Sequence, residues 1–401
     1  MAPDRSTHPG VFLLLLFPFG ASSGYVGVTL GYLLAHRGVS VAAIAGLSAL
    51  SLLPQTWKFA WAPLVDTTLT PKTWYAIGAF ATGGLIALTG LIPISASGLP
   101  LIEALVFTFS LASSLLGMAT EALAAHATED AKKGRVGGWL QAGNLGGAGI
   151  GGGLGLWIAQ HSGIAWLSPV SVGALCASCS LALLIVFERE RRVRRTSYFQ
   201  DLLDVLKDVW EIARSRKGYL ALVILFLPIG TGAASNLWSA IAQDWHATAD
   251  TVALVNGTLG GVVSTFACLA GGYVCDWMDR KAAYGLFGVL TAVCAIAMAV
   301  APRTENMFVL FVLLYAAVLG GAYAAFSAVT LDAIGRGAAA TKYNLMASIS
   351  NVPIAYMTIV DGWAQTKWGS GGMLLVEAAI GVLAVAGFAL FVVGTRSWAR
   401  A

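Results

Sequence analysis

The sequence repeats itself once, at a spacing of about 210 residues. Pro18 returns as Pro228, and we expect each proline to kink its helix. Asp66 returns as Asp276. Further pairs recur at nearly the same spacing, namely Gly20 with Gly230, Glu121 with Asp332, Arg135 with Lys342 and Asn144 with Asn351. Because each repeated residue falls at the same place in a series of long apolar segments, the sequence predicts two halves made by duplication.

The apolar segments are long enough to cross a membrane. Hydrophobic residues make up 57% of the 401 residues and charged residues only 11%, whereas soluble domains carry about 25% charged residues. A helix of roughly 20 apolar residues crosses the hydrocarbon core. We therefore expect an all-α membrane protein with twelve transmembrane helices in two pseudo-symmetric six-helix bundles. The windows are 11–35, 39–63, 73–95, 100–125, 136–160, 165–187, 218–243, 249–275, 282–301, 306–331, 340–363 and 371–395.

The pattern predicts an N-terminal bundle over 1–187, a cytoplasmic linker over 188–217 and a C-terminal bundle over 218–401. The linker holds nine basic and six acidic residues, which no span accommodates. Its apolar residues recur at helical spacing, so we expect a short amphipathic helix on the membrane surface there. The first window is longer than a signal-peptide core of about 7–15 residues, so we expect it to remain as the first helix.

The basic residues set the expected orientation. If the N-terminus is cytoplasmic, 20 of the 24 Lys and Arg residues fall on the cytoplasmic side. The positive-inside rule then places both termini in the cytoplasm, and we expect a cell inner membrane. The net charge of +4 reflects this topology, so no nucleic-acid partner is expected. The expected partners are the lipid bilayer and a small-molecule substrate, with the protein acting as a monomer.

The sequence contains no pattern typical of a metal or cofactor site. Cys176 and Cys179 form one C-x-x-C pair, which lacks the remaining ligands of a zinc site, so we interpret it as packing. Eight glycines lie between Gly143 and Gly155. No Gly-Lys-Ser/Thr follows them, as a phosphate loop would require, and small residues let membrane helices approach closely. We therefore expect no cofactor. The sequence also contains no nucleophile motif, so we expect no enzymatic activity.

Several motifs resemble the major facilitator superfamily. The stretch 271–281 resembles the G-x-x-x-D-R-x-G-R-R signature of that superfamily, with Arg280 and Lys281 as basic members and Asp279 in place of the usual glycine. The glycine-rich window resembles the antiporter motif of the superfamily, but Ala148 stands where proline is expected. The resemblance implies alternating access at the interface between the two repeats, and the missing proline gives no reason to infer antiport.

A second motif resembles a narrower group. Residues 57–66 read WKFAWAPLVD, which is similar to the K-F-x-W-A-P-x-x-D segment of the AmpG and acetyl-coenzyme A transporter group and of related siderophore permeases. This resemblance implies proton-coupled secondary transport of a medium-sized polar or amphipathic solute. Siderophore or acetyl-coenzyme A uptake is the alternative substrate class. The alternative from a different functional class is a transporter-like receptor that signals without moving a solute.

The superfamily resemblance places the substrate site on four helices of the two bundles. Hydroxyl, amide and aromatic groups near the middle of these spans suit a sugar-containing or amphipathic solute, although hydrogen bonds between helices explain part of the set equally well. The substrate candidates on these helices are Ser22, Ser23, Tyr25, Ser113, Thr231, Ser235, Asn236, Trp238, Tyr323 and Ser327. Lys58, Asn351 and Tyr356, on two other predicted helices, are further substrate candidates. Lys58 has two further candidate roles, a pair with Glu121 or contact with lipid headgroups.

Charged residues inside the spans are the candidates for coupling and gating, because each costs at least about 2.5–3.5 kcal/mol to insert. Asp361, Glu103 and Glu377 are the proton-coupling candidates, with Asp361 first. Contacts between acidic and basic residues at the cytoplasmic helix ends are expected to close the cytoplasmic side of the transport pathway. The alternative is that these acids only neutralise the helix ends. The gating candidates are Asp66, Glu121, Arg135, Asp276, Arg280, Asp332 and Lys342.

Overall fold

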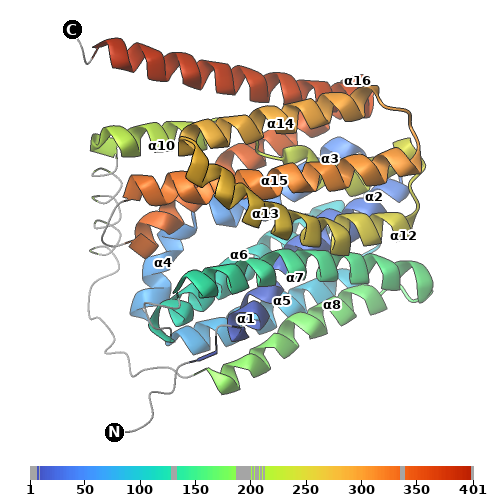
Figure 1. Ribbon diagram of the computed structural model, residues 1–401. Coiled ribbons are helices and arrows are strands. Elements are labelled where there is room, and N and C mark those ends of the chain that lie inside the picture. The colour runs from blue at the N-terminus through green and yellow to red at the C-terminus, as the bar shows by residue number, and fades with distance from the viewer. Residues whose placement is uncertain are drawn as a thin grey trace, which may run out of the picture. The chain divides into compact units, whose positions relative to one another are not determined.

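The computed structural model is helical throughout the part of the chain that it describes (Figure 1). That part comprises residues 7–8, 10–127, 133–186, 200, 203, 207, 210, 213–334 and 339–398. Each of the twelve predicted windows lies on helical segments, which confirms the predicted all-α class. Among the described residues, eight segments are long and apolar enough to cross a membrane.

The helices of the first half follow the predicted windows. Their bounds are α1 (Val11–Gly24), η1 (Tyr25–Leu30), α2 (Gly31–His36), α3 (Val41–Thr56), α4 (Lys58–Thr67), α5 (Pro71–Leu88), η2 (Thr89–Leu91), α6 (Leu99–Ala127), α7 (Lys133–His161), α8 (Leu167–Ser178) and η4 (Cys179–Ile185). Most of the predicted amphipathic linker helix lies outside the described residues.

The helices of the second half are more broken. Their bounds are α10 (Arg216–Phe226), η5 (Ala233–Leu237), α11 (Trp238–Ile241), η6 (Ala242–Trp245), α12 (Ala249–Val252), η7 (Ala253–Leu259), α13 (Gly260–Trp277), α14 (Arg280–Val300), α15 (Glu305–Ile334) and α16 (Ala339–Trp398). The last of these is two helical arms that meet at Gly369, where φ is 67°.

Contacts divide the described residues into two compact units. Unit 1 takes its residues from Met1–Val39, Ala60–Leu202 and Ala249–Val262. Unit 2 takes its residues from Ser40–Phe59, Leu203–Thr248 and Val263–Ala401. Each unit therefore contains most of one predicted half and one segment from the other half. The domain boundaries expected from the repeat stay a prediction.

In unit 1, the glycine-rich helix α7 packs closely against α1 on one side and η7 on another. Gly149 of α7 lies against Gly257 of η7, so that a Cβ atom added to either would lie 2.8 Å from the carbonyl oxygen of the other. The Thr29 hydroxyl donates to the Gly152 carbonyl at 2.9 Å. Close backbone contact of this kind is what the glycine density predicts.

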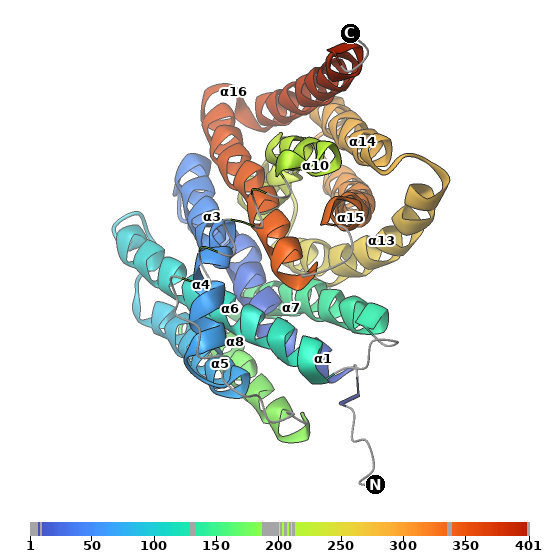
Figure 2. The ribbon, with the colours of Figure 1, turned by 90° about the vertical axis from the view of Figure 1, so that its left-hand side faces the viewer.

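In unit 2, α10 lies among α14, α15 and α16 (Figure 2). The core there combines Ile224 of α10 with Phe287 of α14, Ala325 of α15 and Met346 of α16. Helix α3 packs along α16, where Gly362 lies against Ala45. This packing holds both arms of α16 beside the seventh predicted span.

The seventh predicted span, 218–243, is broken rather than kinked. Helix α10 ends at Phe226, and a short 3₁₀ turn resumes only at Ala233. The sequence predicts a continuous helix with a kink at Pro228, and this expectation is wrong. Proline has no N–H to continue the helix, and Gly230 and Gly232 adopt φ values of 58° and 65°, which side chains other than glycine rarely adopt.

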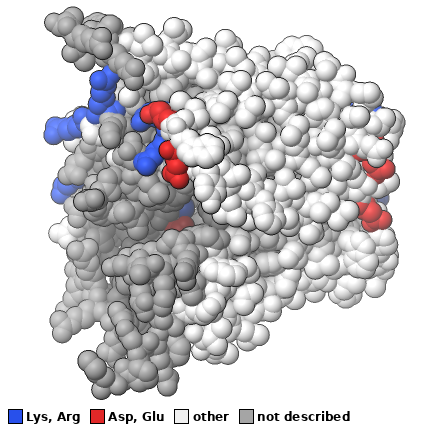
Figure 3. All heavy atoms as spheres, viewed as in Figure 1, with Lys and Arg blue, Asp and Glu red and all other residues white. Residues whose placement is uncertain are grey.

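Charged groups in unit 2 hold the end of this broken span in place. The Arg303 guanidinium lies 3.8 Å from the centre of the Trp245 ring in η6. The Ser370 hydroxyl, next to the bend of α16, donates to the Asp244 carboxylate. Burial lowers the pKa of Arg303, and the nearby Asp244 carboxylate partly offsets that effect. On the face drawn in Figure 3, charged side chains gather near helix ends and leave an uncharged band between them.

Close packing at Gly149 generates the first prediction. Gly149→Leu forces the helices apart at Gly257, and overpacking of this kind costs about 1–3 kcal/mol, so the protein unfolds at a lower temperature in detergent. Gly146→Leu is the matched control, because a Cβ at Gly146 meets nothing within 4 Å. Equal unfolding temperatures for the two variants would contradict the packing described here.

Candidate functional site

Two of the three predicted proton-coupling acids are buried in unit 2. Asp361 lies on the first arm of α16 and is 0% exposed, and Glu377 lies on the second arm and is 5% exposed. The two carboxyl groups are close enough to interact electrostatically. Glu103, in contrast, is half-buried near the start of α6 in unit 1. The structure thus brings Asp361 and Glu377 together and leaves Glu103 apart.

Glu377 accepts hydrogen bonds from two elements of unit 2. Its Oε1 accepts the backbone N–H of Ala234 at 3.2 Å and the Tyr315 hydroxyl at 2.8 Å. Ala234 lies just after the break of the seventh span, where its N–H has no helical partner. An unpaired N–H costs several kcal/mol in a bilayer, so the carboxyl group supplies the missing acceptor.

The remaining carboxyl oxygens of this pair have no hydrogen-bond partner. They are both oxygens of Asp361 and Oε2 of Glu377, within the part of the chain that the structure describes. Two ionised carboxylates buried within electrostatic range of each other repel, and burial of each charge costs several kcal/mol. A proton on one of them removes that penalty and supplies a donor. The arrangement can therefore take up and release a proton.

Residues 227–238, which we call the broken segment, make further contacts with α15 and α16. The Asn236 amide donates to the Thr358 hydroxyl at 2.9 Å, three residues before Asp361. The Trp238 ring meets the Tyr315 ring edge to face, with 5.2 Å between ring centres. The acid pair, α15 and the broken segment therefore form one connected cluster, which we call the acid-pair cluster. It consists of Ala234, Asn236, Trp238, Tyr315, Thr358, Asp361 and Glu377.

Three predicted substrate residues line one small cavity in unit 2. The cavity has a volume of about 50 Å³, and Thr231, Tyr323 and Asn351 are among its lining residues. Ile354 also lines it and precedes Asp361 by seven residues, or about 10 Å along a helix. A space of this size holds a single small polar group and is too small for a whole medium-sized solute.

Other predicted substrate residues of unit 2 stabilise the break. The Tyr356 hydroxyl donates to the carbonyl of Phe226, the last residue of α10, at 3.3 Å. The Ser235 hydroxyl donates to the Gly232 carbonyl at 2.6 Å. Ser327 of α15 is half-buried. These hydrogen bonds give Tyr356 and Ser235 a structural role that needs no bound ligand.

The predicted substrate residues of unit 1 pair with neighbours. The hydroxyls of Ser22 and Ser113 lie 3.0 Å apart, and both side chains are buried. The Tyr25 hydroxyl lies 2.8 Å from Thr89 Oγ1. Ser23 is exposed. Lys58, which belongs to unit 2, is the half-buried first residue of α4.

The structure describes only part of the predicted gating set. The side chains of Asp66, Arg135, Asp332 and Lys342 lie outside the described residues. Asp276 is exposed at the end of α13, Arg280 is the exposed first residue of α14, and Glu121 is half-buried in α6. The acid-base pairs expected at the cytoplasmic ends therefore stay a prediction.

Sequence reasoning missed Tyr315, the side chain that donates to Glu377. One signal was available, because Tyr315 lies eight positions before the predicted Tyr323 on the same helix. Its partner lies 62 residues away in sequence, which a local pattern does not indicate. Among the described residues, no group of three His, Cys, Asp or Glu side chains is arranged to hold a metal ion.

Comparison with known proteins identifies the family. The Major Facilitator Superfamily profile matches residues 12–356, most of the chain. The chain belongs to the major facilitator superfamily. It is thus a multi-pass membrane protein of a family of secondary transporters, as the resemblance in the sequence implies.

Solved structures of this superfamily share the fold. A bacterial homolog of the human lysosomal transporter Spinster is 13% identical, with a TM-score of 0.74 and coverage of 97% of each chain. A D-xylose–proton symporter is 15% identical, with a TM-score of 0.70 and coverage of 95% of each chain. The nucleoside transporter NupG is 14% identical, with a TM-score of 0.67 and coverage of 95% of this chain and 98% of that one. Identities this low support the fold alone.

The Tyr315 hydrogen bond generates the second prediction. Tyr315→Phe leaves Glu377 without its side-chain donor, which should destabilise this superfamily member by about 1–3 kcal/mol and lower its thermal unfolding temperature. Tyr75→Phe is the control, because the Tyr75 hydroxyl is buried without a hydrogen-bond partner among the described residues. That control should be neutral or stabilising, and a larger loss in Tyr75→Phe would contradict the assignment.

Proposed function

We propose that this superfamily member is a proton-coupled secondary transporter of a medium-sized polar or amphipathic solute, with Asp361 and Glu377 as the proton-carrying groups. One observation carries the proposal: the buried Glu377 carboxyl accepts the N–H of Ala234 in the broken seventh span. The proton site is thereby connected directly to the segment that contains Thr231, Asn236 and Trp238.

Protonation changes the strength of this connection. An ionised carboxylate accepts a hydrogen bond about twice as strong as a neutral acceptor does. When Glu377 takes up a proton, its hold on Ala234 weakens, and the broken segment gains freedom to move. Thr231 of that segment lines the small cavity together with Tyr323 and Asn351. A proton bound at the acid pair therefore alters the walls of a space where a polar group of the solute binds.

The broken geometry suits this role for a physical reason. Discontinuous membrane helices place backbone groups at ligand and ion sites, because irregular backbone in a membrane persists only where it lies within protein or beside water. Gly230 and Gly232, with φ values of 58° and 65°, let the backbone turn there without side-chain strain. The break is thus a place where backbone and acid pair act together.

The solute class rests on the sequence. The segment WKFAWAPLVD at 57–66 favours an AmpG-like permease, and a siderophore or acetyl-coenzyme A permease is the alternative. The proton coupling is consistent with one similar structure being that of a D-xylose–proton symporter. We further propose an inner-membrane location, cytoplasmic termini, a monomeric state and a cytoplasmic gate formed by the mirrored acids and bases.

Transport by the purified protein in liposomes tests the proposal. Vesicles with an imposed pH gradient are supplied in turn with labelled muropeptides, siderophores and acetyl-coenzyme A. We expect uphill accumulation of one class that collapses when a protonophore removes the gradient. Binding of a solute without movement under any imposed gradient would contradict transport and favour a transporter-like receptor.

The acid pair generates the third prediction. Asp361→Asn removes one proton-binding group, so pH-driven accumulation should fall to the level of vesicles without a gradient, while solute counterflow continues. Glu103→Gln is the control, because Glu103 is half-buried and lies in the other unit. It should leave uphill uptake within about twofold of the wild type, since substitutions away from buried networks change little. Normal uphill uptake by Asp361→Asn would remove Asp361 from the mechanism.

A further inference from the structure

A groove on unit 2 lies apart from the acid-pair cluster and has no role in the transport proposal. Its volume is about 590 Å³, within the range of about 300–1,000 Å³ typical of ligand sites. Three helices line it, namely α10, the first half of α14 and the second arm of α16. Its lining residues include Arg216, Asp279, Lys281, Gly285, Val289 and Phe388.

The groove runs along the helices because its lining residues recur at helical spacing. Ala282, Gly285, Leu286 and Val289 of α14 follow the i, i+3, i+4, i+7 pattern of one helix face. The lining residues of α16, from Val385 to Val392, follow the same pattern. From the start of α14 to Val289 the helix rises about 13 Å, close to half of a hydrocarbon core of about 30 Å.

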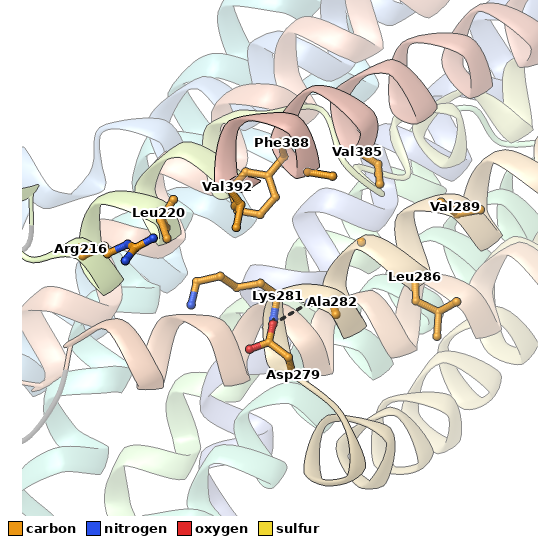
Figure 4. Close-up of a pocket in the computed structure, with 12 residues that line it drawn as sticks. Arg216, Leu220, Asp279, Lys281, Ala282, Leu286, Val289, Val385, Phe388 and Val392 are labelled. Atoms are coloured by element: carbon orange, nitrogen blue, oxygen red, sulfur yellow. Dashed lines mark hydrogen bonds between the residues drawn. The ribbon is translucent and has the colours of Figure 1, made fainter. Parts of the chain in front are cut away.

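The charges of the groove gather at one end. Arg216 and Lys281 lie at that end, and Leu286 and Val289 lie toward the other (Figure 4). Arg216 begins α10 and Lys281 is the second residue of α14, so the charged end coincides with the ends of both helices. Asp279 lies at the same end, and the other lining residues are apolar. The groove therefore has a cationic mouth and an apolar body.

Asp279 offsets only one of the two positive side-chain charges at this mouth. Its Oδ1 accepts the backbone N–H groups of both Lys281 and Ala282 at 3.0 Å, so the carboxylate caps the start of α14. These N–H groups and the positive end of the helix dipole stabilise the carboxylate at the helix start. The side-chain charges of Arg216 and Lys281 remain in excess over the one carboxylate, and an anion at the mouth would be attracted.

The surroundings of the groove indicate that it opens to the bilayer. α14 and the second arm of α16 both belong to segments that are long and apolar enough to span a membrane. Leu286 is 41% exposed, and Leu290, one turn further, is also exposed. Large exposed apolar side chains on a membrane span contact lipid tails. A ligand at this depth comes from the bilayer rather than from water.

We propose that this groove binds an anionic glycerophospholipid of the membrane leaflet next to Arg216. The phosphate lies between the guanidinium of Arg216 and the ammonium of Lys281, and one acyl chain lies along Gly285, Val289 and Phe388. Basic pockets between membrane helices are suited to anionic headgroups. The bound chain joins α10 to α14 and α16, so the lipid stabilises unit 2.

The test is a lipid titration of the purified full-length protein, delipidated in detergent, with thermal unfolding as the measurement. Phosphatidylglycerol is the probe, and phosphatidylcholine is the zwitterionic comparison. The wild type should unfold at a higher temperature with phosphatidylglycerol than with phosphatidylcholine. Equal stabilisation by the two lipids would overturn the proposed headgroup site.

Charge removal tests the mouth of the groove. R216Q/K281Q should raise the phosphatidylglycerol concentration for half-maximal stabilisation by about 25-fold, since each charge near a headgroup contributes about fivefold. Its unfolding temperature in phosphatidylcholine should match the wild type, which verifies folding. K207Q/R214Q is the control, because Lys207 and Arg214 are exposed and are not among the lining residues. If both double variants raise the half-maximal phosphatidylglycerol concentration equally, the effect comes from general surface charge, and the proposed headgroup site is wrong.

Filling the groove tests its apolar body. Gly285→Leu should abolish the stabilisation by phosphatidylglycerol, because a Cβ at Gly285 meets only Val385, at 3.7 Å, and a leucine side chain has room to occupy the groove. Gly387→Leu is the control, since a Cβ there meets nothing within 4 Å and Gly387 does not line the groove. Full lipid response in Gly285→Leu would overturn the proposal. Light scattering could also overturn the proposal. If the wild type is dimeric and Gly285→Leu is monomeric, the groove binds a second copy of the chain and not a lipid.

Discussion

A backbone N–H with no helical partner is the constraint on which the acid-pair cluster depends. The seventh span breaks after Phe226, and in a membrane each backbone group released by such a break needs an acceptor inside the protein. Glu377 supplies that acceptor for Ala234. Because the acceptor is a carboxyl group, the proposed mechanism makes the strength of this hydrogen bond depend on whether a proton is bound.

The rest of unit 2 supports this arrangement. Tyr315 and the Asn236–Thr358 hydrogen bond fix the acid pair and the broken segment to the same helices. Arg303, stacked on Trp245, holds the far end of the span. The second arm of α16, which carries Glu377, also lines the groove between α10, α14 and α16. A lipid bound there would act on the packing around the site while leaving the proton-binding groups untouched.

The sequence predicts the parts of this structure that local patterns determine. Apolar windows predict the helices, and glycine density predicts the close approach at Gly149. Insertion cost selects Asp361, Glu103 and Glu377, of which the structure buries Asp361 and Glu377. The break itself is not predicted, because Pro228 indicates only a kink, and the positive φ values of the glycines depend on tertiary packing. Tyr315 is missed because its partner is distant in sequence, and most gating side chains lie outside the described residues.

Hydrogen exchange of the Ala234 amide measures the central interaction most directly, and it needs no knowledge of the solute. After correction for the intrinsic exchange rate, protection of residues 227–237 should fall as the pH is lowered, because protonated Glu377 accepts a weaker hydrogen bond. Glu377→Gln should exchange rapidly at every pH. Protection that does not change with pH in the wild type, and that is equal in Glu377→Gln, would contradict the account.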